Sequence, residues 1–257
     1  MAAFADGLPC WADAQLDDLA AGKRFYGELF GWTFDDNADE RYGFYTNAFS
    51  DGKRVAALAP KQDGRMPTVW TVYFATADAA ATAETIKGEG GQLVLDPMEV
   101  SPYGTMAVAM DPGGAVFGLW QAAQHEGFEK QREPGSFCWV EVYTRLPQVV
   151  DPFYDTVFGY ESLDLGEDMG GFRIWSPAGA EPSPETAVGG RSVIGPELPD
   201  ELPSYFLLYF QVADCDATVA TATRLGGRVR QPPFDMPYGR MAILSDDQGA
   251  TFAVLQG

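Results

Sequence analysis

The chain has 257 residues, of which 46% are hydrophobic and 13% aromatic, enough to build more than one hydrophobic core. Its formal net charge of −20 argues against nucleic acid and anionic membranes as partners, because both require a positive surface on the protein. The sequence shows no signal peptide and no membrane span, and its three cysteines lack CxxC spacing, so we expect a cytoplasmic protein.

The first predicted elements are a strand, a helix and three further strands. Alternating apolar residues predict a strand at residues 8–16. Asp18 is the expected N-cap of the helix, which ends at Phe30 because Gly31 suits a left-handed residue after the last turn. The next strands are expected at residues 32–34, 42–46 and 55–58.

The same order follows a second time. A strand is expected at residues 68–76, and Asp78 is the expected N-cap of an alanine-rich helix that runs to Ile86. Three more strands are expected at residues 92–95, 106–110 and 116–120. Charged residues 126–135 are interpreted as a linker between an N-terminal domain, residues 1–125, and a C-terminal domain, residues 136–257.

The second half of the chain repeats the first. The helix end Phe25-Tyr-Gly-Glu-Leu-Phe-Gly-Trp32 recurs as Phe153-Tyr-Asp-Thr-Val-Phe-Gly-Tyr160, displaced by 128 residues (153 − 25). The turn Asp111-Pro-Gly-Gly114 recurs as Asp246-Asp-Gln-Gly249, displaced by 135 residues (246 − 111). We assign the change in displacement to a loop rich in proline and glycine at residues 176–203, and we infer a duplicated domain.

These features together resemble the vicinal oxygen chelate superfamily, which contains glyoxalase I, bleomycin-resistance proteins and extradiol dioxygenases. The resemblance depends on Asp18 with the helix end at residues 23–32, on Asp78 with Gly90-Gly91, and on the turn at residues 111–114. It implies an α+β fold of four βαβββ modules, arranged as two tandem glyoxalase-like domains, each with a half-barrel cup.

Enzymes of this superfamily generally hold a divalent metal through His and Glu side chains inside each cup. The positions that the resemblance implies for these ligands are occupied in this sequence by Trp11, Thr71, Gly118, Trp139, Leu207 and Ala253. None of them carries an imidazole, carboxylate or thiolate, which a divalent ion requires. The one histidine, His125, precedes the linker, so we expect no metal and no cofactor.

The strand alternation that directs Trp11 into the first cup also directs Asp13 and Gln15 there. The matching residues of the second cup are Trp139, Glu141 and Tyr143. Glu141 and Asp13 are the candidate catalytic residues. The candidate ligand-binding residues are Trp11, Gln15, Thr71, Tyr73, Trp120, Trp139, Tyr143, Leu207 and Tyr209, with Tyr103 and Tyr238 in turns at the cup rims. The alternative is that these side chains are core residues without a ligand.

Two functions remain open on this basis. The first is a binding protein, of the resistance or sequestration kind, that holds a small hydrophobic or aromatic metabolite in a metal-free cup. The alternative is a metal-independent lyase, isomerase or hydroxylase-like enzyme that uses a carboxylate as general base. In either case the expected partner is a small molecule and the expected state is a monomer or weak dimer, because fusion of two domains supplies the contacts of a dimer internally.

Overall fold

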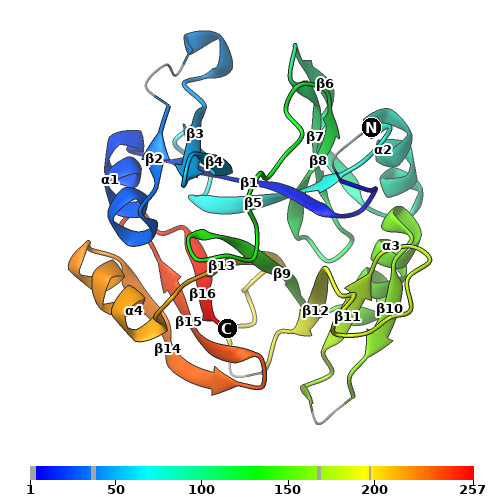
Figure 1. Ribbon diagram of the computed structural model, residues 1–257. Coiled ribbons are helices and arrows are strands. Elements are labelled where there is room, and N and C mark those ends of the chain that lie inside the picture. The colour runs from blue at the N-terminus through cyan, green and yellow to red at the C-terminus, as the bar shows by residue number, and fades with distance from the viewer. Residues whose placement is uncertain (1–3, 36–38, 167–168, 197) are drawn as a thin grey trace. The chain divides into compact units, whose positions relative to one another are not determined.

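The computed structural model describes residues 4–35, 39–166, 169–196 and 198–257, which form four modules of one strand, one helix and three strands (Figure 1). Module 1 contains β1 (Pro9–Leu16), α1 (Leu19–Phe30), β2 (Thr33–Phe34), the 3-10 helix η1 (Glu40–Tyr42), β3 (Thr46–Ser50) and β4 (Lys53–Pro60). Module 2 contains β5 (Val69–Ala75), α2 (Ala79–Gly88), β6 (Gln92–Val100), β7 (Gly104–Met110) and β8 (Val116–Ala122). Module 3 contains β9 (Ser136–Thr144), α3 (Pro147–Phe158), β10 (Glu161–Asp164), β11 (Arg173–Ser176) and β12 (Gly189–Val193). Module 4 contains β13 (Tyr205–Gln211), α4 (Cys215–Arg224), β14 (Arg228–Met236), β15 (Gly239–Ser245) and β16 (Thr251–Gln256).

The strands form two open eight-stranded sheets. Their orders are β2-β3-β4-β1-β5-β8-β7-β6 and β10-β11-β12-β9-β13-β16-β15-β14, so the second sheet repeats the order of the first. Both sheets are mixed. In the first, β1 runs parallel to β4 whereas β3 and β4 are antiparallel, and in the second, β9 runs parallel to β12 whereas β11 and β12 are antiparallel. The α+β class and the four βαβββ modules are therefore confirmed. None of the helices in the described ranges is long and apolar enough to span a membrane.

The helix ends follow from local sequence chemistry. The carboxylate of Asp18 accepts a hydrogen bond from the backbone N–H of Ala21 at 2.9 Å, and Asp78 caps α2 in the same way. Gly31 and Gly159 end α1 and α3 with φ of 72° and 66°, a conformation that costs glycine little. The predicted N-caps Asp18 and Asp78 and the predicted end of the first helix before Gly31 are confirmed, whereas α2 runs to Gly88, two residues beyond the predicted Ile86.

The predicted strand at residues 42–46 is wrong. Glu40–Tyr42 form η1, and β3 begins only at Thr46. Gly43 and Phe44 both have φ of 61°, which is incompatible with a strand, and the Phe44 N–H donates to the Asp39 carbonyl. The aromatic and β-branched residues here indicated a strand, but the chain reverses direction before it enters the sheet.

The region interpreted as a loop at residues 176–203 contains β12, which pairs with β9 and β11. Its first two residues, Gly189 and Gly190, look like a turn in the sequence. In the structure they allow close packing, because a Cβ at Gly190 would lie 2.6 Å from the Arg173 carbonyl oxygen. Glycine is therefore required here for a strand, and the loop interpretation is corrected.

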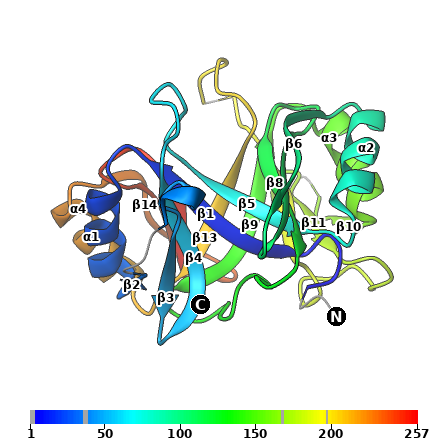
Figure 2. The ribbon, with the colours of Figure 1, turned by 90° about the horizontal axis from the view of Figure 1, so that it is seen from above.

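Contacts divide the chain into two compact units, and each unit draws on both halves of the sequence. Unit 1 consists of Met1–Trp11, Val72–Gly127 and Val140–Phe206. Unit 2 consists of Ala12–Thr71, Phe128–Trp139 and Leu207–Gly257. Within unit 1, α2 lies beside α3, and within unit 2, α1 lies beside α4, as Figures 1 and 2 both show. The division into domains 1–125 and 136–257 with a linker at 126–135 stays a prediction.

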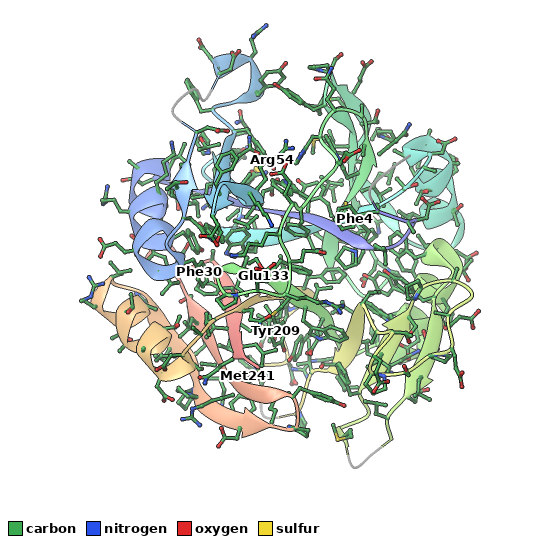
Figure 3. The ribbon with its side chains drawn as sticks, in the orientation of Figure 1. Phe4, Phe30, Arg54, Glu133, Tyr209 and Met241 are labelled. Carbon is green, nitrogen blue, oxygen red and sulfur yellow. The ribbon has the colours of Figure 1, made fainter. Side chains whose placement is uncertain are left out.

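In unit 2 a buried tyrosine joins the first helix to the last turn of the chain. The Tyr26 hydroxyl donates to Asp246 at 2.8 Å and accepts a hydrogen bond from the Trp70 indole N–H at 2.9 Å. Phe30, labelled in Figure 3, packs at 5.2 Å from the ring of Phe210 in the same core. Burial raises the pKa of Tyr26 well above its usual value, and the charge of Asp246 raises it further, so the phenol remains a neutral donor.

Unit 1 contains the same arrangement at the repeated positions. The Tyr154 hydroxyl, on α3, donates to Asp111 at 2.9 Å. The other carboxylate oxygen of Asp111 accepts hydrogen bonds from the backbone N–H groups of Gly113 and Ala115. Burial raises the pKa of Asp111, although these hydrogen bonds oppose the shift. The repeated helix end and the repeated turn of the sequence thus meet in the core of each unit.

Candidate functional site

Glu141 is the best-defined candidate site residue, and it lies in unit 1 on β9. Because β9 runs parallel to β12, Glu141 lies opposite Gly190, and Ser192 lies two residues further along β12. The Ser192 hydroxyl donates a hydrogen bond to Glu141 Oε2 at 3.0 Å. Only 6% of Glu141 is exposed to solvent. A buried carboxylate is unfavourable without polar partners, so this pair fixes both the position and the orientation of the acid.

Two tyrosines lie next to this pair. Tyr143 follows Glu141 on the same face of β9, and its ring stacks on that of Tyr205 with a centroid distance of 5.1 Å and an interplanar angle of 4°. The pKa of Tyr205 is raised, first by burial and then by the negative charge of Glu141. Both tyrosines are half-buried, so they keep exposed surface beside a buried acid. We name Glu141, Tyr143, Ser192 and Tyr205 the Glu141 cluster.

The matching acid of the first half, Asp13, lies in unit 2. Asp13 is buried on β1, and its Oδ2 accepts a hydrogen bond from the Tyr45 hydroxyl at 3.0 Å. Gln15, at the position that corresponds to Tyr143, is half-buried, and its Oε1 has no hydrogen-bond partner among the described residues. The residue that corresponds to Tyr205 is Val69, displaced by 136 residues (205 − 69). The first half therefore repeats the acid of the Glu141 cluster but not its stacked tyrosines.

Three predicted ligand-binding residues of the first half lie in unit 1 and are buried: Trp11, Tyr73 and Trp120. The ring of Tyr73 lies directly over Gly118, where a Cβ would come within 2.1 Å of Tyr73 Cδ1. The ring of His125 lies at a right angle to Trp11, with 4.4 Å between the centroids. The chain's single histidine thus folds back onto the predicted binding face of the first half.

The remaining predicted site residues differ in their burial. In unit 2, Leu207 and Tyr209 (Figure 3) are buried on β13, whereas Thr71 on β5 and Trp139 on β9 are half-buried. Tyr103 and Tyr238 are exposed in the turns between β6 and β7 and between β14 and β15. The role of each in binding stays a prediction.

Among the described residues, the positions that the resemblance implies for metal ligands carry no imidazole, carboxylate or thiolate. Within the described residues, no three His, Cys, Asp or Glu side chains converge as a metal site requires. Two of the positions that the resemblance implies, Trp11 and Leu207, hold buried apolar side chains, and the Tyr73 ring fills the space at Gly118. The two candidate acids instead accept hydrogen bonds from hydroxyl groups.

Three functional candidates were missed from the sequence: Ser192, Tyr205 and Tyr45. Ser192 belongs to the strand that was interpreted as loop, and its partner is 51 residues away in the chain. Tyr205 lies two residues before Leu207 on β13, so strand alternation alone could have placed it on the same face. No local signal indicates the Tyr45 contact, because it depends on the turn at Gly43 and Phe44.

Comparison with known proteins gives one family. The protein-family model described as "Glyoxalase/Bleomycin resistance protein/Dioxygenase superfamily" matches residues 11–162 of this chain. "Putative glyoxylase CFP32" of Mycobacterium tuberculosis is 37% identical over 260 residues, covering 98% of this chain and 96% of that protein. "Anthracycline biosynthesis protein DnrV" of Streptomyces peucetius is 38% identical over 270 residues, covering 100% of this chain and 95% of that protein.

A solved structure agrees with this assignment at the level of the fold. The Mn(II)-bound glyoxalase from Novosphingobium aromaticivorans superposes with a TM-score of 0.65 at 14% identity, covering 98% of this chain and 82% of that chain. Together with the order of the strands in both sheets, these matches agree with the repeats found in the sequence. The chain therefore belongs to the Glyoxalase/Bleomycin resistance protein/Dioxygenase superfamily.

Proposed function

We propose that this protein binds a small hydrophobic or aromatic metabolite at the Glu141 cluster, without a metal ion, and sequesters it. The observation that carries this proposal is a buried carboxylate, held by the Ser192 hydroxyl at 3.0 Å, next to two stacked and half-exposed tyrosine rings. The rings supply a flat apolar surface, and the acid supplies a charged acceptor.

This combination favours a ligand with one flat aromatic face and one polar edge. A phenol or an ammonium group donates to a buried carboxylate more strongly than to a neutral acceptor, because the local dielectric constant is low. The relative from Streptomyces peucetius is named for anthracycline biosynthesis, and anthracyclines are fused-ring aromatic compounds with phenolic edges. That name supports a compound of this class as the ligand of the present chain.

The first experiment measures binding of alizarin, a dihydroxyanthraquinone, by titration calorimetry and by quenching of tryptophan fluorescence. Glu141→Gln keeps the shape of the side chain and removes its charge, so we expect the Kd to rise about 10- to 100-fold, the equivalent of a charge-assisted hydrogen bond. Asp13→Asn is the matched control, since it makes the same change at the corresponding position, and we expect the Kd to stay within about twofold of the wild-type value. Equal losses in both variants would contradict the assignment of the ligand to the Glu141 cluster.

The alternative function is metal-independent catalysis with Glu141 as general base. Its favouring observation is the geometry of Glu141, a buried carboxylate that the Ser192 hydroxyl holds in one position beside two aromatic rings, as a general base requires. Incubation of candidate ligands with the protein, followed by mass spectrometry, distinguishes the two functions. Product formation that Glu141→Gln abolishes while binding persists would indicate an enzyme, and recovery of unchanged ligand supports sequestration.

We further propose a cytoplasmic protein that acts as a monomer or weak dimer with a small molecule as its partner. The net charge of −20 supports the expectation that nucleic acid and membranes are not partners. Light scattering coupled to size-exclusion chromatography measures the mass directly, and a stable tetramer would contradict this part of the proposal.

A further inference from the structure

His125 is the only histidine of the chain, and it lies in unit 1 shortly after β8. Its ring stands edge-on to Trp11 at 4.4 Å between centroids and lies 5.6 Å from the ring of Trp120. Trp11 is 3% exposed and His125 is 8% exposed. The side chain of His125 therefore covers Trp11 and Trp120, two of the residues predicted to bind a ligand in the first half.

Backbone hydrogen bonds hold His125 in this position. The Trp120 indole N–H donates to the carbonyl of His125 at 2.8 Å. The backbone N–H groups of Ala123 and His125 both donate to the carbonyl of Tyr103, at 2.9 and 3.1 Å. The segment is thus tied both to the end of β8 and to the turn that precedes β7, so the imidazole ring is placed by several independent contacts.

The corresponding tryptophan of the second half has a different environment. Trp139 corresponds to Trp11 at a displacement of 128 residues (139 − 11) and is half-buried, whereas Trp11 is almost fully buried. Tyr143 and Tyr205 of the Glu141 cluster are likewise half-buried. Exposed aromatic surface therefore remains at these positions of the second half, while the matching tryptophan of the first half is covered by His125.

We propose that the imidazole of His125 occupies, in the first half, the position of a ring-shaped ligand against Trp11 and Trp120, and so closes this half. The protein then binds one ligand molecule per chain, at the Glu141 cluster only. The second statement rests on the proposed function, whereas the first statement concerns the packing of His125 and can be tested by itself.

The test of the first statement uses His125→Gly, which removes the ring and leaves a ring-sized space between tryptophans. Imidazole is the probe. We expect imidazole at about ten times its Kd to raise the melting temperature of His125→Gly by roughly 3 to 6 °C, because a ligand that binds only the folded state stabilises it. His125→Phe, which refills the space, and the wild-type protein are the controls, and their melting temperatures should not rise. His125→Ala serves as a second variant if the glycine variant does not fold. An equal effect of imidazole on all variants, or no effect on any, would overturn the proposed role of His125.

The test of the second statement is the stoichiometry of alizarin binding, measured by titration calorimetry. We expect one molecule per wild-type chain, with an affinity that falls in Glu141→Gln and not in His125→Phe. Two equivalent molecules per wild-type chain would overturn the closure of the first half and leave the proposed function intact. Absence of any alizarin binding, combined with stabilisation of His125→Gly by imidazole, would instead reject alizarin as a ligand and retain the role of His125.

Discussion

The two buried tyrosines offer a comparison inside one molecule, because their hydroxyl groups make different numbers of hydrogen bonds. Within the described ranges Tyr154 makes one, to Asp111 at 2.9 Å, and Tyr26 makes two, to Asp246 at 2.8 Å and from Trp70 at 2.9 Å. Tyr154→Phe should lower the free energy of unfolding by about 1.5 to 3 kcal/mol, the value of one hydrogen bond to a charged group. Tyr26→Phe should lower the free energy of unfolding by ~1 to 3 kcal/mol more than Tyr154→Phe does, since it also leaves the buried indole N–H of Trp70 without an acceptor.

Urea unfolding followed by tryptophan fluorescence measures both changes. Trp70 reports on unit 2 through its contact with Tyr26, and Trp175, at 4.8 Å from the ring of Tyr154, reports on unit 1. The melting temperature should fall by about 2 to 4 °C for each kcal/mol lost. Tyr238→Phe is the control, because Tyr238 is 54% exposed and its change should stay within about 0.5 kcal/mol. Equal losses for Tyr26→Phe and Tyr154→Phe would refute the reasoning from hydrogen-bond number.

Three further predictions concern buried side chains and a glycine that packs against one. Burial raises the folded-state pKa of Asp111, so its protonation favours the folded state below the unfolded pKa of about 4, and this contribution is lost as the pH rises through the folded pKa. Urea unfolding at several pH values measures this contribution. As the pH falls, the contribution of Asp111 to the free energy of unfolding should be present in the wild-type protein and missing in Asp111→Asn, and identical pH profiles of the two proteins would contradict this. Burial raises the pKa of Cys138 to about 12 and also raises that of Cys10, so iodoacetamide at pH 8 should modify neither thiol in the folded protein, as mass spectrometry can test. Gly118→Ala should lower the stability by about 1 to 3 kcal/mol in thermal unfolding, because its Cβ would lie 2.1 Å from the Tyr73 ring; an unchanged melting temperature would show that the ring moves freely.

The parts of the fold that follow from local chemistry could be predicted from the sequence. Asp18 caps α1 because its carboxylate reaches a backbone N–H three residues ahead, and Gly31 ends that helix because it adopts φ of 72° without strain. Repetition of such signals, displaced by 128 residues before the region 176–203 and by 135 residues after it, indicated the module order and the duplication. The prediction of a strand at residues 42–46 was wrong because Gly43 and Phe44 adopt left-handed backbone conformations, which override the β propensity of their neighbours.

The candidate site was only partly predictable for a different reason. Glu141 and Tyr143 were identified because alternation along one strand is a local property. Ser192 was not identified, because Gly189 and Gly190 at the start of its strand suggest a turn in the sequence, whereas in the structure they permit close packing of the strand. The contact of His125 with Trp11 spans 114 residues (125 − 11), and nothing in the charged sequence that follows His125 indicates that its ring is buried. Such contacts depend on tertiary structure, which overrides local composition.

The two halves agree where a buried polar group needs a partner and differ where a ligand would bind. The hydrogen bond from Tyr26 to Asp246 has its counterpart in that from Tyr154 to Asp111, because each buried carboxylate requires the same donor. The predicted binding faces do not correspond in this way, since the stacked tyrosines of the Glu141 cluster are matched in the first half by glutamine and valine. A purely structural role for the Glu141 cluster would give no reason for this difference, because both halves form the same sheet from the same strand order. Binding of an aromatic ligand in one half, with the other half closed by His125, accounts for both observations.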